Sequence, residues 1–280
     1  MRQMDDYVSM PDEETLRNLV ERIPGERCSS PRCGEAAVAA MRRGDRDMFL
    51  CAGHAERAAH RGLSVFRQSA DGTGVDEFVV DEAAIRSRWE DRWSADAYAP
   101  QWRSQTIPLE ILEAVEEEWF PRGATVLDIG CGSGEIAAWL AREGYHVLGV
   151  DFAEAAIERA REAHADVPRL AFEVGDIRDR PTRPGEFDAL LDRGCLHLVG
   201  DEHAPAYVRN VAASAKRGAR FLLLHPAYVK AGRDAQVRHL EELLAPEFEI
   251  ERVADTIFDS DSGASRETPR EGLAVWMTRR

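Results

Sequence analysis

The strongest constraint on how this chain folds is a short apolar segment that runs directly into a cluster of glycines. Residues 124–136 read ATVLDIGCGSGEI, so a run of β-forming residues ends at Gly130, Gly132 and Gly134. Residues 135–142 follow with apolar side chains at helical spacing, which predicts a helix. Strand, glycine turn and helix in this order predict the first unit of a doubly wound α/β domain, where glycines let the backbone turn sharply and approach a ligand.

Three carboxylates stand at the ends of three successive predicted strands. Asp128 lies near the end of the first strand, Asp151 follows the strand expected at 146–150, and Asp176 follows the strand expected at 170–174. A carboxylate at the first position opposes a pyrophosphate but suits an ammonium group. A carboxylate at the second position can accept both hydroxyls of a ribose. The set therefore predicts a site for a cationic nucleoside, S-adenosylmethionine.

This set of residues resembles the class I S-adenosylmethionine-dependent methyltransferases. The resemblance implies an α/β fold with a doubly wound, seven-stranded Rossmann-like sheet. It implies that Asp176 and the backbone of Ile177 contact the adenine and that Phe152 packs on the cofactor, with ordinary core packing as the alternative for Phe152. The cofactor-binding residues expected on this basis are Asp128, Gly130, Cys131, Gly132, Gly134, Asp151, Phe152, Asp176, Ile177 and Asp192.

Two further segments narrow the resemblance. Residues 89–93 read WEDRW before the predicted domain, and residues 192–194 read DRG after the fourth predicted strand. Both resemble the thiopurine and thiol S-methyltransferase branch, which implies S-methylation of a thiol. The chain departs from this branch at Cys195 and His197, so an O-, N- or C-methyltransferase of a specialised metabolite stays open.

Aromatic side chains are concentrated just before the predicted domain. Trp89, Trp93 and Trp102 are expected either to form a lid over the cofactor, which would exclude water and shape the acceptor pocket, or to cover the sheet as ordinary core. His225 ends the fifth predicted strand and is expected at the rim of the active site in this fold.

The segment after the fourth strand carries the residues expected to act on the acceptor. His197 is the candidate general base or acceptor-orienting group, because histidine titrates near neutral pH; a solvent-facing histidine is the alternative. Asp192 would hold the cofactor's amino group or orient the acceptor. Arg193 would pair with an acidic substrate or with Asp151.

A second chemical pattern precedes the domain. Cys28 and Cys33 form one pair, and Cys51 and His54 form another. Four soft or borderline ligands in two pairs predict a tetrahedral zinc site, with three free cysteines and a surface histidine as the alternative. A four-residue shell leaves no open position, so this zinc would be structural and would supply folding free energy to a small module.

These patterns divide the chain into three segments. Residues 1–70 are expected to form an N-terminal helix and the zinc-binding module, residues 71–105 a linker and aromatic lid, and residues 106–280 the methyltransferase domain. Few apolar residues at 67–78 predict the linker, and the polar stretch 259–269 predicts a long loop. Zinc modules also bind macromolecules, so a macromolecular target, or a binding protein that only senses cofactor, stays open.

Composition limits the partners. A net charge of −15 argues against general affinity for nucleic-acid backbones or anionic lipid, so the expected partner is a small-molecule acceptor. No apolar run approaches the ~18 residues that span a bilayer, and no apolar signal segment stands at the N-terminus, so a cytoplasmic location is expected. Five cysteines argue against a disulfide framework, and Cys131 and Cys195 are expected to be packing residues. The oligomeric state stays open.

Overall fold

The structure is a computed structural model that forms two compact units, residues 1–82 with 200–202 and residues 83–199 with 203–280. This division does not define functional domains, so the domain boundaries expected at residues 70 and 105 stay predictions. The structure describes residues 13–29, 33–43, 46–59, 65–69, 75–77, 82–94, 106–200, 203–226, 233–258 and 270–280.

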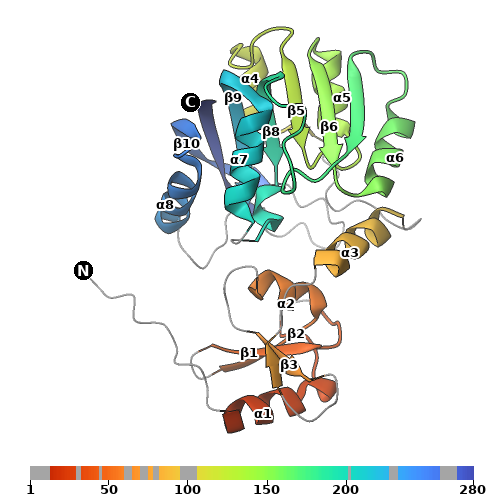
Figure 1. Ribbon diagram of the computed structural model, residues 1–280, viewed down its shortest axis with the longest axis vertical. Helices are drawn as coiled ribbons and strands as arrows, with labels where there is room; N and C mark the ends of the chain where they lie inside the picture. Colours follow the sequence, from red (N-terminus) through yellow and green to blue (C-terminus); the bar gives the residue numbers. More distant parts are fainter. Residues whose placement is uncertain are drawn as a thin grey trace. The chain divides into compact units, whose positions relative to one another are not determined.

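The first unit is a small sheet with two helices (Figure 1). Its four strands are antiparallel and lie in the order β2-β1-β3-β4. The apolar residues of the N-terminal segment, Leu19, Val20 and Ile23, pack with Phe49 and Phe66 in one buried cluster. Such a buried face is what the helical spacing of these residues predicts. Its elements are α1 (Glu13–Glu21), η1 (Ile23–Gly25), β1 (Ala39–Arg43), β2 (Arg46–Leu50), α2 (Ala52–Ala59), β3 (Phe66–Gln68) and β4 (Val75–Glu77).

The secondary structure expected in this region is wrong in part. The stretch 67–78, expected to be a loop or linker, contains parts of two paired strands, β3 and β4. The strands are three residues long and mostly polar, so their composition is that of a loop. Phe66 and Val75 supply the apolar contacts with the core of the first unit.

The second unit contains a seven-stranded sheet in the order β10-β11-β9-β8-β5-β6-β7. Strands β5 to β9 are parallel, and β11 and β10 close the sheet as an antiparallel pair. The elements are α3 (Glu82–Ser94), α4 (Leu109–Glu116), β5 (Thr125–Ile129), α5 (Glu135–Arg142), β6 (His146–Asp151), α6 (Glu154–Ala163), β7 (Leu170–Val174), β8 (Phe187–Arg193), η2 (Leu196–Leu198), α7 (Ala204–Ser214), β9 (Ala215–Pro226), α8 (Arg233–Leu244), β10 (Phe248–Phe258) and β11 (Arg270–Arg279). The predicted seven-stranded, doubly wound sheet is confirmed.

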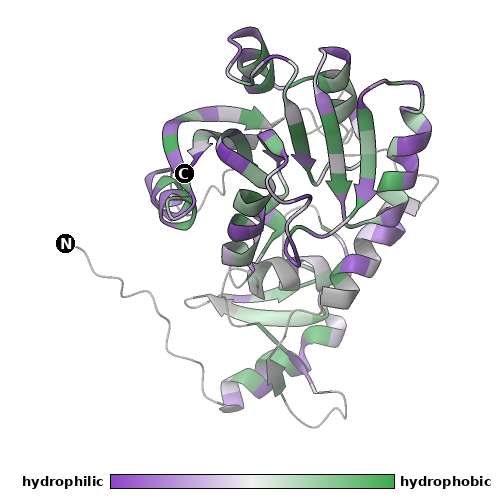
Figure 2. Cartoon of the chain, turned by 45° about the horizontal axis from the view of Figure 1, so that its top comes forward, coloured by the Kyte–Doolittle hydropathy of each residue, from purple (hydrophilic) through white to green (hydrophobic). Residues whose placement is uncertain are grey.

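Successive apolar side chains along each strand point to opposite faces of the sheet, and this produces two cores, one on each face. Leu127, Leu190 and Phe221 belong to the core under α7 and α8. Val126 and Leu191 belong to the core under α4, α5 and α6. The sheet's strands are largely green in Figure 2, because parallel strands covered on both faces are apolar along most of their length.

The five parallel strands end at one edge of the sheet, where the loops that follow them are brought together. The glycine turn follows β5, and the predicted acidic residues follow or end the neighbouring strands. The loop expected at 259–269 lies outside the described residues. Among the helices in the described part of the chain, none has the length and apolar character needed to cross a bilayer.

Candidate functional site

The turn between β5 and α5 uses glycine where no other residue fits. Gly130, Gly132 and Gly134 have φ angles of +69°, +54° and +81°, a region that L-residues with a side chain rarely adopt. A Cβ on Gly134 would lie 2.5 Å from the Phe172 ring. The turn is fixed to β6, because the backbone N–H of Gly130 donates to the Val150 carbonyl over 2.8 Å.

Asp151 joins this turn to the start of α6. Its carboxylate accepts hydrogen bonds from the backbone N–H of Gly132 (3.1 Å) and of Ala153 (2.9 Å). Burial raises the pKa of Asp151 to about 6, against the opposing effect of these two hydrogen bonds. The carboxylate is therefore held beside the glycine turn, at the end of the strand where its position in the sequence predicts it.

Asp128 has the largest upward pKa shift among the carboxylates of the site. It is 4% exposed, and burial raises its pKa to about 7, with the negative charges of Asp192 and Asp151 adding to the shift. The positive charge of Arg193, at the end of the neighbouring strand β8, opposes the shift. A cluster of buried carboxylates with raised pKa values favours the binding of a cation, because a cation stabilises their charged forms.

Asp176, after β7, is engaged by arginine. Arg178 donates to its carboxylate from the backbone N–H (2.9 Å), from Nε (3.1 Å) and from Nη2 (2.8 Å). Burial raises the pKa of Asp176, but the bonds from Arg178 outweigh it and hold the pKa below its usual value. Ile177 is buried beside it, and its carbonyl accepts from Asn210 Nδ2 over 2.8 Å.

Asp192, at the end of β8, is fully buried and faces its own loop. Its carboxylate accepts from the backbone N–H of Cys195 (2.6 Å) and of Leu196 (2.9 Å) and from the hydroxyl of Tyr207 on α7. Burial raises the pKa of Asp192 to about 6, and the hydrogen bonds oppose that shift. The side chain thus sets the shape of the segment that carries His197.

Two histidines meet beside this segment. The rings of His197, on η2, and His225, at the end of β9, are perpendicular, with centroids 6.1 Å apart. Gln236 Nε2 donates to His225 Nδ1 over 2.9 Å and to the Pro226 carbonyl over 3.0 Å. Burial lowers the pKa of His225 to about 4, so this ring is neutral at physiological pH.

The two cysteines near the site are thiols. Burial and neighbouring carboxylates raise the pKa of Cys131 and the pKa of Cys195 well above the usual value. A Cβ on Gly130 would lie 2.8 Å from Cys195 Cβ, which shows how closely the second cysteine packs on the turn. Neither is a nucleophile at neutral pH, since the thiolate is the reactive form.

Helix α3 packs on the glycine turn and on the start of α6. Trp93 is 6% exposed, and a Cβ on Gly132 would lie 3.0 Å from its ring. Trp93 and Trp89 share an apolar cluster with Phe152 and the first residues of α6. Trp102 lies outside the described residues.

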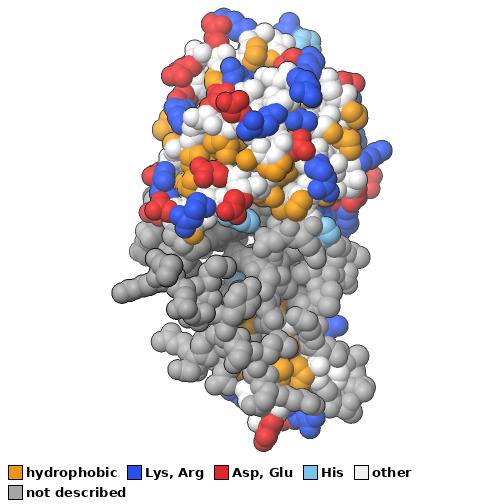
Figure 3. Space-filling view, turned by 60° about the vertical axis from the view of Figure 1, so that its left-hand side comes forward, with side chains coloured by type: hydrophobic (Ala, Val, Ile, Leu, Met, Phe, Trp, Pro, Cys, Tyr) orange, Lys and Arg blue, Asp and Glu red, His pale blue; other side chains and the backbone are white. Residues whose placement is uncertain are grey.

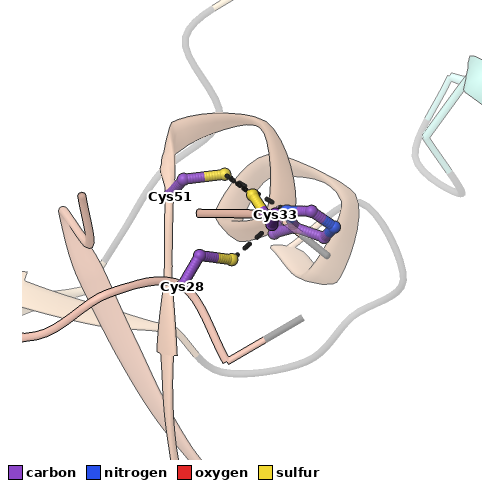
Figure 4. Close-up of side chains that lie close together, drawn as sticks. Cys28, Cys33 and Cys51 are labelled. Atoms are coloured by element: carbon purple, nitrogen blue, oxygen red, sulfur yellow. Dashed lines mark hydrogen bonds between the residues drawn. The ribbon is translucent and has the colours of Figure 1, made fainter. Parts of the chain in front are cut away.

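The four predicted metal ligands lie together in the first unit, and Figure 4 shows the three cysteines among them. Their ligand atoms all lie within 4.8 Å of one another. The Nδ1 atom of His54 is 3.1 Å from Cys51 Sγ and 3.4 Å from Cys28 Sγ, and Cys33 Sγ is 3.6 Å from Cys51 Sγ. Two ligands on a tetrahedral zinc lie roughly 3.6 to 3.8 Å apart. The two sulfurs of Cys33 and Cys51 match that spacing, and the two contacts of His54 Nδ1 are shorter, so the four atoms are gathered on the scale of one zinc site.

Sequence reasoning missed several residues that hold the site. On α3, Arg86 reaches Asp176, and Glu90 accepts from the backbone N–H of Ala155 over 2.9 Å. The spacing of Arg86, Trp89, Glu90 and Trp93 places them on one helical face, which could have indicated a shared surface. No sequence pattern indicated the contacts that Tyr207 and Gln236 make from α7 and α8.

Comparison with known proteins gives a consistent result. Residues 126–218 match a family model described as a methyltransferase domain. The 2-heptyl-1-hydroxyquinolin-4(1H)-one methyltransferase of Mycobacteroides abscessus is 29% identical over 130 residues, which are 46% of this chain and 56% of that protein. The ubiquinone biosynthesis O-methyltransferase of Xanthomonas axonopodis pv. citri is 32% identical over 171 residues, 59% of this chain and 63% of that protein.

A solved structure supports the same fold. The 1,6-didemethyltoxoflavin-N1-methyltransferase of Burkholderia thailandensis, solved with 1,6-didemethyltoxoflavin and S-adenosylhomocysteine, superposes with a TM-score of 0.56 at 21% identity, over 78% of this chain and 95% of that one. The chain spans less than two thirds of the length of the two curated relatives.

Proposed function

We infer that this chain carries a class I S-adenosylmethionine-dependent methyltransferase domain and transfers the methyl group of that cofactor to a small organic molecule. The observation that carries the proposal is the acidic site at the carboxyl ends of β5 and β6. Asp128 and Asp151 are held there with pKa values raised to about 7 and about 6 by burial. Such a pair is costly unless a cationic ligand joins it.

The residues present fit the cofactor by the chemistry of their donors. Asp128, near the end of β5, suits an ammonium group, and Asp151, at the end of β6, suits the ribose hydroxyls. We assign Asp176, Ile177 and Phe152 to the adenine end. When bound, S-adenosylmethionine supplies a methyl group that a positively charged sulfur has already activated.

The chain's own part is to orient the acceptor, receive its proton and exclude water. We assign His197 as the group that receives the acceptor's proton, with the neutral ring of His225 as its neighbour. Asp192 would act as a positioning residue, because its hydrogen bonds fix the loop of His197. Arg193 would balance the charge of Asp128. Trp93 would be the part of the lid that excludes water from the turn.

For the acceptor atom we favour oxygen. One relative is named as an O-methyltransferase and another as the methyltransferase of a hydroxylated quinolinone, which supports a hydroxyl group on a small molecule. A thiol is the second candidate, favoured by the WEDRW and DRG segments at 89–93 and 192–194. Both acceptors lose a proton on methylation, so His197 would serve either.

A small acceptor is also supported by the surface. In the face of the second unit shown in Figure 3, acidic and basic side chains are interspersed rather than gathered by sign. With a net charge of −15, this surface offers little general attraction to a nucleic-acid backbone.

We further propose that Cys28, Cys33, Cys51 and His54 bind one structural zinc ion. All four protein ligands are used, which leaves no position for a substrate. The ion would hold together the loop before β1, the end of β2 and the start of α2. His54 would bind through Nδ1, the atom that lies nearest the sulfurs.

The experiment that tests the function uses methyl-labelled S-adenosylmethionine with a panel of phenols, N-hydroxy heterocycles, thiols, amines and carbon acids. Transfer to the hydroxyl compounds supports the proposal, and transfer to thiols alone selects the second candidate. Label that enters only protein or nucleic acid would contradict a small-molecule acceptor. Binding without any transfer would favour a protein that only senses the cofactor.

A further inference from the structure

Arg86, on α3, reaches a carboxylate that we assign to the cofactor. Its Nη2 atom lies 2.5 Å from Asp176 Oδ2 and 3.1 Å from Asp179 Oδ2. One nitrogen therefore bridges two carboxylates from the loop after β7. Its guanidinium carbon also lies 5.5 Å from the centroid of the Phe152 ring. Arg86 thus covers two residues of the proposed adenine end.

Asp176 has no acceptor position to spare in this arrangement. A carboxylate offers about four lone-pair sites. Arg178 occupies three of these sites with its backbone N–H, Nε and Nη2. Arg86 occupies the fourth, on Oδ2. The side chain of Asp176 is only 6% exposed. An adenine amino group can bond this carboxylate only after one of these donors leaves.

Arg86 is the donor that can leave at low cost. Arg178 is two residues from Asp176 and belongs to the same loop, so losing its bonds would disturb the loop itself. Arg86 comes from another element, its side chain is 38% exposed, and its second partner Asp179 is 67% exposed. Arg86 keeps its pair with Asp179 when it leaves Asp176, and the adenine amino group replaces it as the donor to that buried carboxylate, so no buried acceptor is left without a partner.

The rest of α3 can stay in place during this exchange. Glu90 holds the helix to the backbone N–H of Ala155, and Trp93 holds it to Gly132. Neither contact involves Asp176. The movement required is therefore a change of side-chain rotamer in Arg86 and not the undocking of a helix.

We propose that Arg86 is an adenine gate: it occupies Asp176 until the cofactor's adenine displaces it, and Asp179 then receives it. This proposal rests on the assignment of Asp176 to the adenine in the proposed function. It gives Asp179 and Arg86 opposite effects on cofactor affinity. Arg86 competes with the adenine, whereas Asp179 favours the displaced position of Arg86.

The test is the affinity for S-adenosylhomocysteine, which lacks the sulfonium charge and so responds less to general electrostatics. Calorimetric titration would compare the full-length protein with Arg86→Gln, Asp179→Asn and the double variant. Arg86→Gln is expected to bind about fivefold more tightly and Asp179→Asn about threefold more weakly, the range of a single exposed ion pair. The double variant should match Arg86→Gln, because Asp179 acts only through Arg86.

Arg142→Ala is the matched control, since Arg142 is an exposed arginine in the last turn of α5. Arg86→Ala is a second variant, and unfolding midpoints close to that of the wild type establish that both Arg86 variants fold. Weaker binding by folded Arg86 variants, or additive effects in the double variant, would overturn the gate while leaving the proposed function intact. A wild-type protein that binds no S-adenosylhomocysteine would overturn both.

Discussion

At the scale of single residues, the charge of Asp128 opposes folding in a way that cofactor binding would relieve. Its pKa is raised from 3.8 to about 7, chiefly by burial. The folded protein therefore binds a proton that the unfolded chain releases between about pH 4 and pH 7. The stability that Asp128 contributes is fully present below its pKa in the unfolded state. This stability is lost as the pH rises through its pKa in the folded state. Asp151 and Asp192 act in the same direction.

Asp128→Asn should therefore stabilise the cofactor-free protein at pH 8 and weaken cofactor binding. We expect a gain on the order of 1–3 kcal/mol in the free energy of unfolding at pH 8 and a much smaller gain at pH 5. Urea unfolding at the two pH values, followed by tryptophan fluorescence, measures this. A destabilised variant at pH 8, or unchanged affinity for S-adenosylmethionine, would refute the electrostatic role of Asp128.

His197→Ala should separate catalysis from cofactor binding. Loss of a positioned base is expected to lower kcat on the order of 100-fold or more, while the Kd for S-adenosylhomocysteine stays within about twofold. His146→Ala is the matched control, because His146 is exposed at the start of β6. An unaffected turnover number would remove His197 from the reaction.

The positions of the candidate residues along the sheet follow from the sequence, but their contacts do not. Asp128 and Asp151 can be placed beside the glycine turn because their positions relative to it are local in the chain. The bond from Tyr207 to Asp192 joins elements whose facing side chains no local pattern fixes. Arg86 was missed for the same reason, since a charged residue on an exposed helix has many possible partners.

At the scale of elements, α3 and the glycine turn depend on each other. Trp93 packs so closely on Gly132 that an added Cβ would lie 3.0 Å from its ring. The long helices and strands of the second unit followed from their apolar periodicity. The hairpin of β3 and β4 did not, because two three-residue strands carry too few alternating positions to be distinguished from a loop.

Gly132→Ala should therefore have effects on α3 and on cofactor binding beyond the loss of stability that backbone strain causes. Gly123→Ala is the matched control: Gly123 also has a positive φ, +70°, but an added Cβ there meets nothing within 4 Å. Both substitutions incur a left-handed penalty of about 1–2 kcal/mol. Only Gly132→Ala should also weaken cofactor binding, by about tenfold or more, and change Trp93 fluorescence. Equal effects of the two variants on both measurements would show that α3 does not depend on the turn.

At the scale of the whole molecule, the two units have separate cores and should respond separately to metal removal. The buried clusters of the first unit are small, so zinc would supply much of its folding free energy. All six tryptophans lie at position 89 or later, beyond the first unit's residues 1–82, so the second unit carries every tryptophan that the fluorescence would follow. This permits the two units to be followed independently in the intact chain.

Metal analysis should find about one zinc per chain, and Cys51→Ser should lower that content. A strong chelator should reduce far-ultraviolet circular dichroism from the first unit while leaving tryptophan fluorescence and S-adenosylhomocysteine affinity nearly unchanged. Protein purified without chelators that contains no zinc would refute the metal site. A loss of cofactor affinity on chelation would refute the independence of the two units.

The most direct test of the central claim is a calorimetric titration of the intact protein with S-adenosylmethionine, repeated on Asp151→Ala. We predict about one binding site per chain and an affinity at least about tenfold weaker in the variant, because Asp151 holds both the turn and the proposed ribose position. No binding by the wild-type protein, or equal affinity in the variant, would contradict the assignment of this acidic edge of the sheet as the cofactor site.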